Sequence, residues 1–187
     1  MSCPRTAPGE DDVELTTRRL VMRRLGREHL PDLLALYADP EVSRFLKPLD
    51  EAGHLRRIEE AQQMWSTRGH GRVAVHERGS GRFLGRTGLQ YWPAHDEVEL
   101  TWAFRRDAWG RGFATEAGQA WLRWGFARLD VPSIVAYIAP ENTASRAVAG
   151  RLGMTVRRTD VQHEREVLVY AAFRDAPPGG PLYAAEA

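Results

Sequence analysis

Residues 109–116 read Trp109-Gly110-Arg111-Gly112-Phe113-Ala114-Thr115-Glu116 and join an apolar strand pattern to an amphipathic helix pattern. The two glycines of this turn can adopt positive φ and carry no Cβ, so successive backbone N–H groups can point toward one ligand. The following helix adds unpaired first-turn N–H groups and the positive end of its dipole. The stretch predicts an anion cradle, and it equally suits a tight strand-to-helix turn without a ligand.

The composition is that of one globular domain. At 187 residues, with 43% hydrophobic and 27% charged residues, the chain can bury roughly 70% of its unfolded surface. The 26 basic and 25 acidic residues give a net charge of +1, so we expect neither nucleic acid nor a membrane as a partner. Cys3 is the single cysteine, and no membrane-spanning or signal-like run is present, which favours a cytoplasmic protein. The six histidines are scattered, so no metal site is predicted.

Breaker-rich segments suggest the domain boundaries. Residues 1–14 mix Pro, Gly and acidic residues and are expected to form a flexible leader. Residues 177–181 contain three prolines and two glycines, so residues 175–187 are expected to form a flexible C-terminal tail. A single domain is therefore predicted over residues 15–174.

Hydrophobic periodicity predicts alternating strands and helices within that domain. Strands are expected at residues 17–25, 71–77, 82–91, 97–104, 133–138, 154–159 and 164–173. Helices are expected at residues 27–37, 41–46, 50–68, 114–129 and from about residue 140 to 152. This order predicts a mixed α/β fold in which helices flank one sheet. Alternation also places Glu97 and Glu99 on one face of strand 97–104, opposite an apolar face.

The chain resembles the GNAT superfamily of N-acetyltransferases, and within it the RimJ/RimL-like branch that acetylates ribosomal-protein N-termini. The resemblance rests on residues 18–23, 39–42, 99–102, 109–116, 142–145 and 152–154, which occur in family order. It implies the GNAT fold, a central, mostly antiparallel, twisted sheet flanked by helices. It also implies an acetyl-coenzyme A-dependent enzyme that transfers the acetyl group directly to an amine, without a covalent enzyme intermediate.

The resemblance assigns the cofactor-binding residues. Backbone donors from Arg111, Gly112, Phe113, Ala114 and Thr115 would face the pyrophosphate of acetyl-coenzyme A, and those of Trp102, Ala103, Phe104 and Arg105 would hold its pantetheine arm. The Arg111 side chain could approach the phosphates or remain a solvated loop residue. Asn142 would contact pantetheine, cap the following helix, or do both.

The resemblance also assigns two catalytic residues. Glu99 would be the general base that removes a proton from the amine, with Glu97 as the reserve. A tyrosine general acid of many family members is absent here, since Ala149 occupies the matching position. Ser145 would instead protonate the departing thiolate, although it could equally be a helix-bonded or solvated serine.

The acceptor stays open at this stage. The branch favours a protein or peptide N-terminal α-amine, with an aminoglycoside or amino acid as alternatives. A polycationic acceptor should favour an acidic cleft. Helix 50–68, which is expected to line the acceptor site, carries both acidic and basic side chains and so favours neither kind of acceptor. A non-catalytic coenzyme A-binding module is a second class. A dinucleotide-binding domain is disfavoured, because its glycine turn should follow an early strand in a parallel βαβ unit. A homodimer is left open.

Overall fold

The computed structural model describes residues 13–162 and 164–175. The expected leader as far as residue 12, with Cys3, and the tail from residue 176 lie outside the described residues. Strand β1 begins at Val13, two residues inside the expected leader. The division into leader, single domain and tail stays a prediction.

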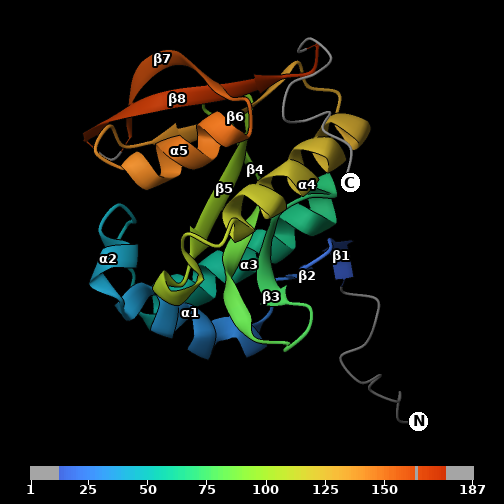
Figure 1. The fold of residues 1–187 in the computed structure, drawn as a ribbon, viewed down its shortest axis with the longest axis vertical. Helices are drawn as coiled ribbons and strands as arrows, with labels where there is room; N and C mark the ends of the chain where they lie inside the picture. The colour runs from blue at the N-terminus through green and yellow to red at the C-terminus, as the bar shows by residue number, and fades with distance from the viewer. Residues whose placement is uncertain (1–12, 163, 176–187) are drawn as a thin grey trace.

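One eight-stranded sheet organises the molecule, with strand order β1-β2-β3-β4-β5-β6-β8-β7 (Figure 1). The strands are β1 Val13–Thr16, β2 Leu20–Arg24, β3 Arg72–Glu77, β4 Phe83–Trp92, β5 Glu97–Phe104, β6 Ser133–Ile138, β7 Thr155–Gln162 and β8 Arg165–Phe173. All neighbouring strands are antiparallel except β5 and β6, which are parallel. The predicted mixed, mostly antiparallel sheet is confirmed.

Helices pack against both faces of this sheet. The helices are α1 Leu30–Ala38, α2 Pro40–Ser43, α3 Glu51–Arg68, α4 Phe113–Arg128 and α5 Thr143–Arg151, with short 3-10 turns at Arg27–His29 and Arg106–Ala108. The larger core joins α4 and α5 to the face of β5 that bears Val98 and Leu100. A second core joins α1, α2 and α3 to the opposite face, which bears Ala103. The predicted alternation along β5 is confirmed, and the second face is the one that carries Glu97 and Glu99.

The predicted strand over residues 17–25 is wrong at its start. Thr17 and Leu20 form a tight turn there, with Thr17 N–H donating to Leu20 O at 2.9 Å and Leu20 N–H donating to Thr17 Oγ1 at 3.1 Å. A hydroxyl that satisfies nearby backbone competes with strand pairing. The predicted helix 41–46 is likewise displaced to α2, because Asp39 Oδ1 accepts from Glu41 N–H at 2.9 Å and caps an earlier start.

The parallel pair β5–β6 is short. Its register holds one Cα pair, Glu99 with Val135. Beyond it, Trp102 on β5 and Ile138 on β6 both line open space rather than pairing with each other. The sheet is therefore divided between its first five strands and its last three, and this division positions the site described below.

Candidate active site

The turn at residues 109–112 has the backbone geometry that its glycines predict. Gly110 has φ of 72° and Gly112 has φ of 78°, and Gly112 is the N-cap of α4. The first bond of the helix runs from Glu116 N–H to Gly112 O at 3.0 Å. The N–H groups of Phe113, Ala114 and Thr115 therefore have no helical acceptor, and no side chain caps this helix.

A partly buried carboxylate, that of Glu116, links this turn to residues 17–19. Glu116 Oε1 accepts from Thr17 Oγ1 at 2.6 Å and from Arg19 N–H at 3.0 Å, and Glu116 Oε2 accepts from Arg19 Nε at 2.6 Å. The Arg19 guanidinium also donates to Arg111 O at 2.8 Å. Burial raises the pKa of Glu116, yet the bonds from Thr17 and Arg19 outweigh it, and the net pKa is lowered. Arg19 thus joins the carboxylate of Glu116 to the backbone of the turn.

A cavity of about 640 Å³ opens in front of the turn, and we name it the turn cavity. It lies between the end of β5, the start of α4, the first turns of α5 and the segment after α2. Eight predicted cofactor residues line it: Trp102, Ala103, Phe104, Gly112, Phe113, Ala114, Thr115 and Asn142. The structure brings these residues together from three separate segments of the chain.

Two predicted residues, Arg105 and Arg111, lie outside the turn cavity. Arg105 N–H donates to Leu84 O at 2.8 Å, and its side chain contacts Asp107 at 3.3 Å. The Arg111 guanidinium pairs with Glu77 at 3.1 Å and stacks over the Phe113 ring. Local acidic partners hold both guanidinium groups at the surface. The predicted cofactor contacts of Arg105 and of the Arg111 backbone stay predictions, and the ion pair with Glu77 favours the loop-residue alternative for the Arg111 side chain.

A second cavity, of about 470 Å³, lies on the side of the sheet that carries Glu99. We name it the arginine cavity. Its charged lining consists of five basic side chains and two acidic ones: Lys47, Arg56, Arg57, Arg72, Arg86, Glu60 and Glu99. Sequence periodicity missed this clustering, because Arg72 and Arg86 lie on different strands and Arg57 lies on α3.

The two cavities meet at one place. Phe45, Leu46, Trp102, Asn142 and Ser145 line both of them. In Figure 1 the short helix α2 and the start of α5 face each other across this region, from the two parts of the divided sheet. A group in the turn cavity can therefore reach a group in the arginine cavity beside Trp102 and Ser145.

Asn142 and Ser145 form the start of α5. Asn142 Oδ1 accepts from Ser145 N–H at 3.0 Å, so the capping alternative for Asn142 is realised. Trp102 Nε1–H donates to Ser145 Oγ at 3.2 Å, which leaves the serine O–H group free to donate elsewhere. Ala149, by contrast, is fully buried in the core and lines neither cavity.

Glu99 lies at the floor of the arginine cavity and is 8% exposed. Trp92 Nε1–H donates to its Oε2 atom at 2.5 Å. Burial raises the pKa of Glu99, against the opposing effects of Trp92 and of the cations Arg72 and Arg86. A carboxylate with a raised pKa is a stronger base than an ordinary glutamate.

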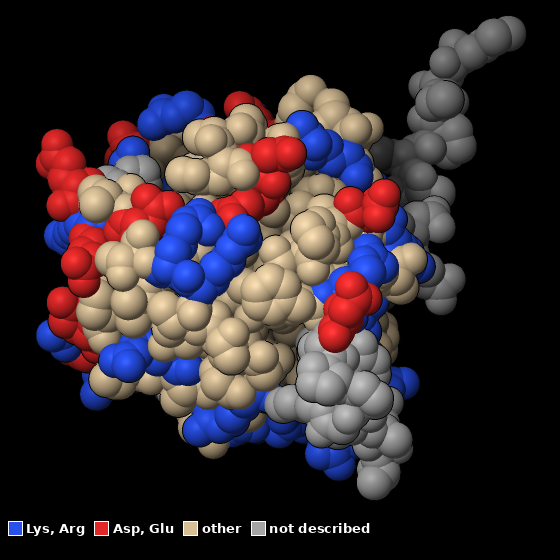
Figure 2. All heavy atoms as spheres, turned by 90° about the horizontal axis from the view of Figure 1, so that it is seen from above, with Lys and Arg blue, Asp and Glu red and all other residues tan. Residues whose placement is uncertain are grey.

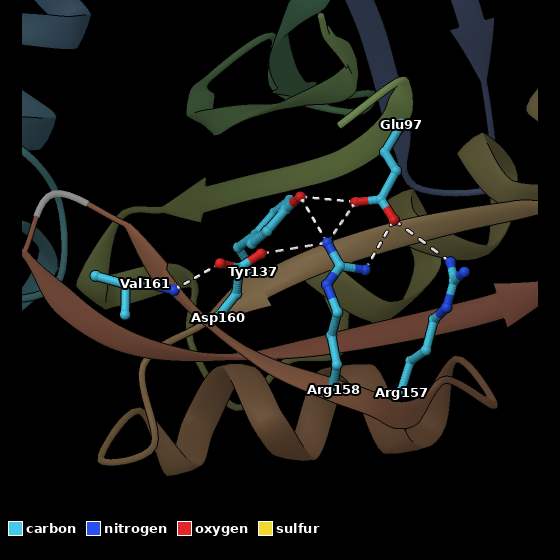
Figure 3. Close-up of polar contacts among 6 residues, drawn as sticks. All are labelled: Glu97, Tyr137, Arg157, Arg158, Asp160 and Val161. Atoms are coloured by element: carbon cyan, nitrogen blue, oxygen red, sulfur yellow. Dashed lines mark hydrogen bonds and ion pairs between the residues drawn. The ribbon is translucent and has the colours of Figure 1, made fainter. Parts of the chain in front are cut away.

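Glu97, two residues away on the same face, has the opposite environment (Figure 3). Its carboxylate accepts from both terminal nitrogens of Arg158 at 2.8 and 2.9 Å and from Tyr137 Oη at 2.7 Å, and Arg157 lies at 3.4 Å. The bonds from Arg158 lower the pKa of Glu97 despite its partial burial. This carboxylate joins β5, β6 and β7, and its lone pairs are engaged.

Replacing Arg158 with Ala is expected to lower the free energy of unfolding by about 2 kcal/mol, because Glu97 loses a two-pronged charged partner. Arg157→Ala is the matched control and should cost less, since Arg157 is more exposed and makes one longer contact. Urea denaturation measures the free energy of unfolding of both variants.

The stabilisation by the Arg158–Glu97 pair should depend on pH. Because the folded pKa of Glu97 is lowered, this stabilisation is fully present above the unfolded pKa, near 4.3. The Arg158→Ala effect should therefore shrink as pH falls through the folded pKa of Glu97. Equal losses for the two variants at neutral pH would contradict this assignment.

The surface charge pattern is mixed on one face of the molecule. On the face seen in Figure 2, acidic and basic side chains lie next to one another. Within residues 13–162 and 164–175, no group of three or more His, Cys, Asp or Glu side chains is placed to hold a metal ion. Among the described helices, none combines the length and the apolar character needed to cross a bilayer.

Comparison with known proteins identifies the family. The model of the acetyltransferase (GNAT) domain matches residues 19–155. The uncharacterized protein YkkB of Bacillus subtilis is 29% identical over 163 residues, which cover 84% of this chain and 94% of YkkB. An acetyltransferase structure from Agrobacterium tumefaciens superposes with a TM-score of 0.76 and 31% identity, covering 84% of this chain and 92% of that one.

A more distant structure shares the fold. It is an acetyltransferase of Salmonella typhimurium that modifies the N-terminal serine of ribosomal protein L7/L12. It has a TM-score of 0.73 and 17% identity, and the match covers 84% of this chain and 96% of that one. The domain match over most of the described residues, together with the arrangement of the turn at residues 109–112, decides the assignment. The chain belongs to the GNAT acetyltransferase family and is an acetyl-coenzyme A-dependent N-acetyltransferase.

Proposed function

We propose that this enzyme acetylates the N-terminal α-amine of a protein or peptide, with acetyl-coenzyme A in the turn cavity and the amine in the arginine cavity. The observation that carries the proposal is the junction of the two cavities beside Trp102 and Ser145. A donor and an acceptor held on either side of this junction can react directly. The Salmonella acetyltransferase, which has the same fold, modifies the N-terminal serine of a ribosomal protein. This supports the choice of an α-amine as acceptor.

The residues of the turn cavity fit coenzyme A. The free amides of Phe113, Ala114 and Thr115 would hold its pyrophosphate, since a Cβ-free turn and a helix N-terminus suit a phosphate. Asn142 uses its side-chain oxygen for capping, and within the described residues its N–H₂ group has no recorded acceptor, so this group would donate to the pantetheine arm. The bound acetyl-coenzyme A supplies a thioester, whose carbonyl carbon is the centre that the amine attacks.

Glu99 is the proposed general base. An α-amine has a pKa of about 8 and is largely protonated at neutral pH, so it must lose a proton before it attacks. Glu99 lines the arginine cavity and its pKa is raised by burial, which suits it to accept that proton directly or through one water. Gln90 pairs with Glu99 in the sheet register, and its buried Oε1 atom has no partner among the described residues. That oxygen would accept a second N–H of the amine.

Ser145 is the proposed general acid. Its hydroxyl borders both cavities, so it lies where the thiolate departs. The hydrogen bond that it accepts from Trp102 polarises the O–H group toward donation. A small, partly buried serine beside an indole takes the place of the tyrosine that is absent at Ala149.

A thiol-release assay with acetyl-coenzyme A tests the proposal directly. The acceptors are N-terminal peptides, aminoglycosides and amino acids at equal concentration. We expect turnover with peptides that have a free α-amine and none with the same peptides after N-terminal acetylation. Turnover confined to aminoglycosides, or tight coenzyme A binding without turnover of any amine, would overturn the proposed function.

Ser145→Ala is expected to lower kcat by about tenfold, equivalent to 1.4 kcal/mol, with little change in coenzyme A affinity. The control is Ser66→Ala on α3, whose hydroxyl bonds only Gln63 O at the surface. The same assay measures kcat, and calorimetry measures the coenzyme A Kd. An unchanged kcat in Ser145→Ala would remove the acid role from this residue.

A further inference from the structure

The arginine cavity contains more positive charge than an amine acceptor explains. An amine is itself cationic before it reacts, and five basic groups around it raise the cost of bringing it in. The guanidinium groups of Arg57 and Arg72 have no hydrogen-bond or ion-pair partner among the described residues, and the Nε atom of Arg72 is buried without a partner there. Buried donors of this kind are normally satisfied, so the cavity is incomplete as a protein-only arrangement.

The guanidinium groups come from three elements and converge on the face of the sheet that bears Glu99. Arg86, Gly88 and Gln90 alternate along β4 and share one face. Arg72 on β3 pairs with Gly88, and Glu99 on β5 pairs with Gln90, so both arginines lie on the face that bears Glu99. Arg57 enters from α3. Arg86 is held in place, because its Nε and one terminal nitrogen donate to Tyr37 Oη at 2.9 and 2.8 Å.

The pKa values of these arginines are lowered in part by one another, which is consistent with their convergence. Burial and then the charges of Arg86 and Arg57 lower the pKa of Arg72, and burial followed by Arg86 lowers the pKa of Arg57. A bound anion would relieve this repulsion between the guanidinium groups. Glu99 supplies only part of that charge, since its own pKa is raised.

We infer that the acceptor carries a carboxylate close to its reacting amine and that Arg57 and Arg72, ordered by Arg86, bind that carboxylate. This inference rests on the proposed function, because it places the acceptor in the arginine cavity. Guanidinium donors suit a planar carboxylate, and each charged hydrogen bond is stronger than a neutral one. For a peptide the carboxylate is an Asp or Glu side chain near the N-terminus, and for a free amino acid it is the α-carboxylate.

This inference also favours carboxylate-bearing acceptors over polycationic ones. A polycationic aminoglycoside would meet like charges from Arg56, Arg57 and Arg72 in the same cavity. Like-charge contacts of this kind contribute to specificity by disfavouring the wrong acceptor. The expectation that helix 50–68 alone would favour neither sign was incomplete, because strands β3 and β4 contribute two of the arginines.

The test compares kcat/KM for matched peptides that begin Ser-Asp or Ser-Glu, their amide counterparts Ser-Asn or Ser-Gln, and a Ser-Lys peptide. For the wild-type enzyme we expect the acidic peptides to exceed the amide peptides by at least tenfold and the Ser-Lys peptide to be the poorest. In Arg72→Gln this preference should fall to within about twofold of unity, mainly through KM. Arg165→Gln, an exposed arginine on β8, is the matched control and should keep the preference.

Two further comparisons distinguish the outcomes. Free glutamate compared with its α-amide tests the second source of the carboxylate. Acetylation of free glutamate, with less of its amide and none of the peptides, would support the carboxylate site while overturning the peptide acceptor. Calorimetric binding of the Ser-Asp and Ser-Asn peptides, with coenzyme A present, decides the matter if no acceptor turns over. Equal kcat/KM for acidic and amide peptides, or a preference unchanged in Arg72→Gln, would overturn the carboxylate site while leaving peptide acetylation intact.

Discussion

Replacing Glu99 with Gln is expected to lower kcat/KM by about 10²-fold or more, the range that general-base catalysis usually contributes. The substitution keeps the shape of the side chain and an oxygen that can accept from Trp92 Nε1, so the fold and the coenzyme A Kd should change little. What is lost is the ability to take the proton of the amine. The thiol-release assay measures the loss.

The pH profile makes the assignment sharper. Burial raises the pKa of Glu99, so the acid limb of kcat/KM should lie above the ordinary glutamate pKa of about 4.3, with activity falling as pH drops through it. In Glu99→Gln that limb should disappear and leave only the titration of the substrate amine. Glu97→Gln is the matched control, because Glu97 shares the face but is engaged by Arg158. A hundredfold loss in Glu97→Gln together with normal activity in Glu99→Gln would reverse the two roles.

Gly112→Val is expected to raise the coenzyme A Kd by about tenfold or more. Gly112 has φ of 78°, and a residue with a side chain loses about 1–2 kcal/mol in this region, more when it is β-branched. Relaxing that strain turns the amides of Phe113 and Ala114 away from a common point. Isothermal calorimetry with coenzyme A measures the affinity.

Gly150→Val on α5 is the control for this substitution. A Cβ at Gly150 meets no atom within 4 Å and its φ is not in the left-handed region, so the coenzyme A Kd should stay within about twofold of wild type. The gentler Gly112→Ala covers the case in which the valine variant does not fold, and it should still weaken binding. Wild-type affinity in Gly112→Ala would show that the turn does not hold the pyrophosphate.

The predictable parts of the site depend on neighbours in sequence. The positive φ of Gly110 and Gly112 follows from a short turn before a helix, and the shared face of Glu97 and Glu99 follows from strand alternation. Most strand and helix bounds follow in the same way, with β1 and the start of β2 as exceptions. Sequence reasoning identified Ser145 from the family pattern, and its contact with Trp102 could not be read from spacing.

The parts that were missed depend on distant residues. Arg19 and Glu116 are 97 residues apart, and nothing local indicates that one braces the other. The convergence of Arg57, Arg72 and Arg86 requires the register of β3 with β4 and the packing of α3. The sequence left two alternatives for the Arg111 side chain, and its partner Glu77, 34 residues away on β3, favours the surface loop position.

Because β5 and β6 share only one register pair, part of the edge of each strand is unpaired in the middle of the sheet rather than at its outer edge. A border of this kind normally attracts another chain and promotes aggregation. Here the border lies beside the turn cavity, which the ends of β5, α4 and α5 line. Because β5 and β6 share only one register pair, we expect a linear arm bearing amide groups to pair with the free edge of β5 as an added strand would.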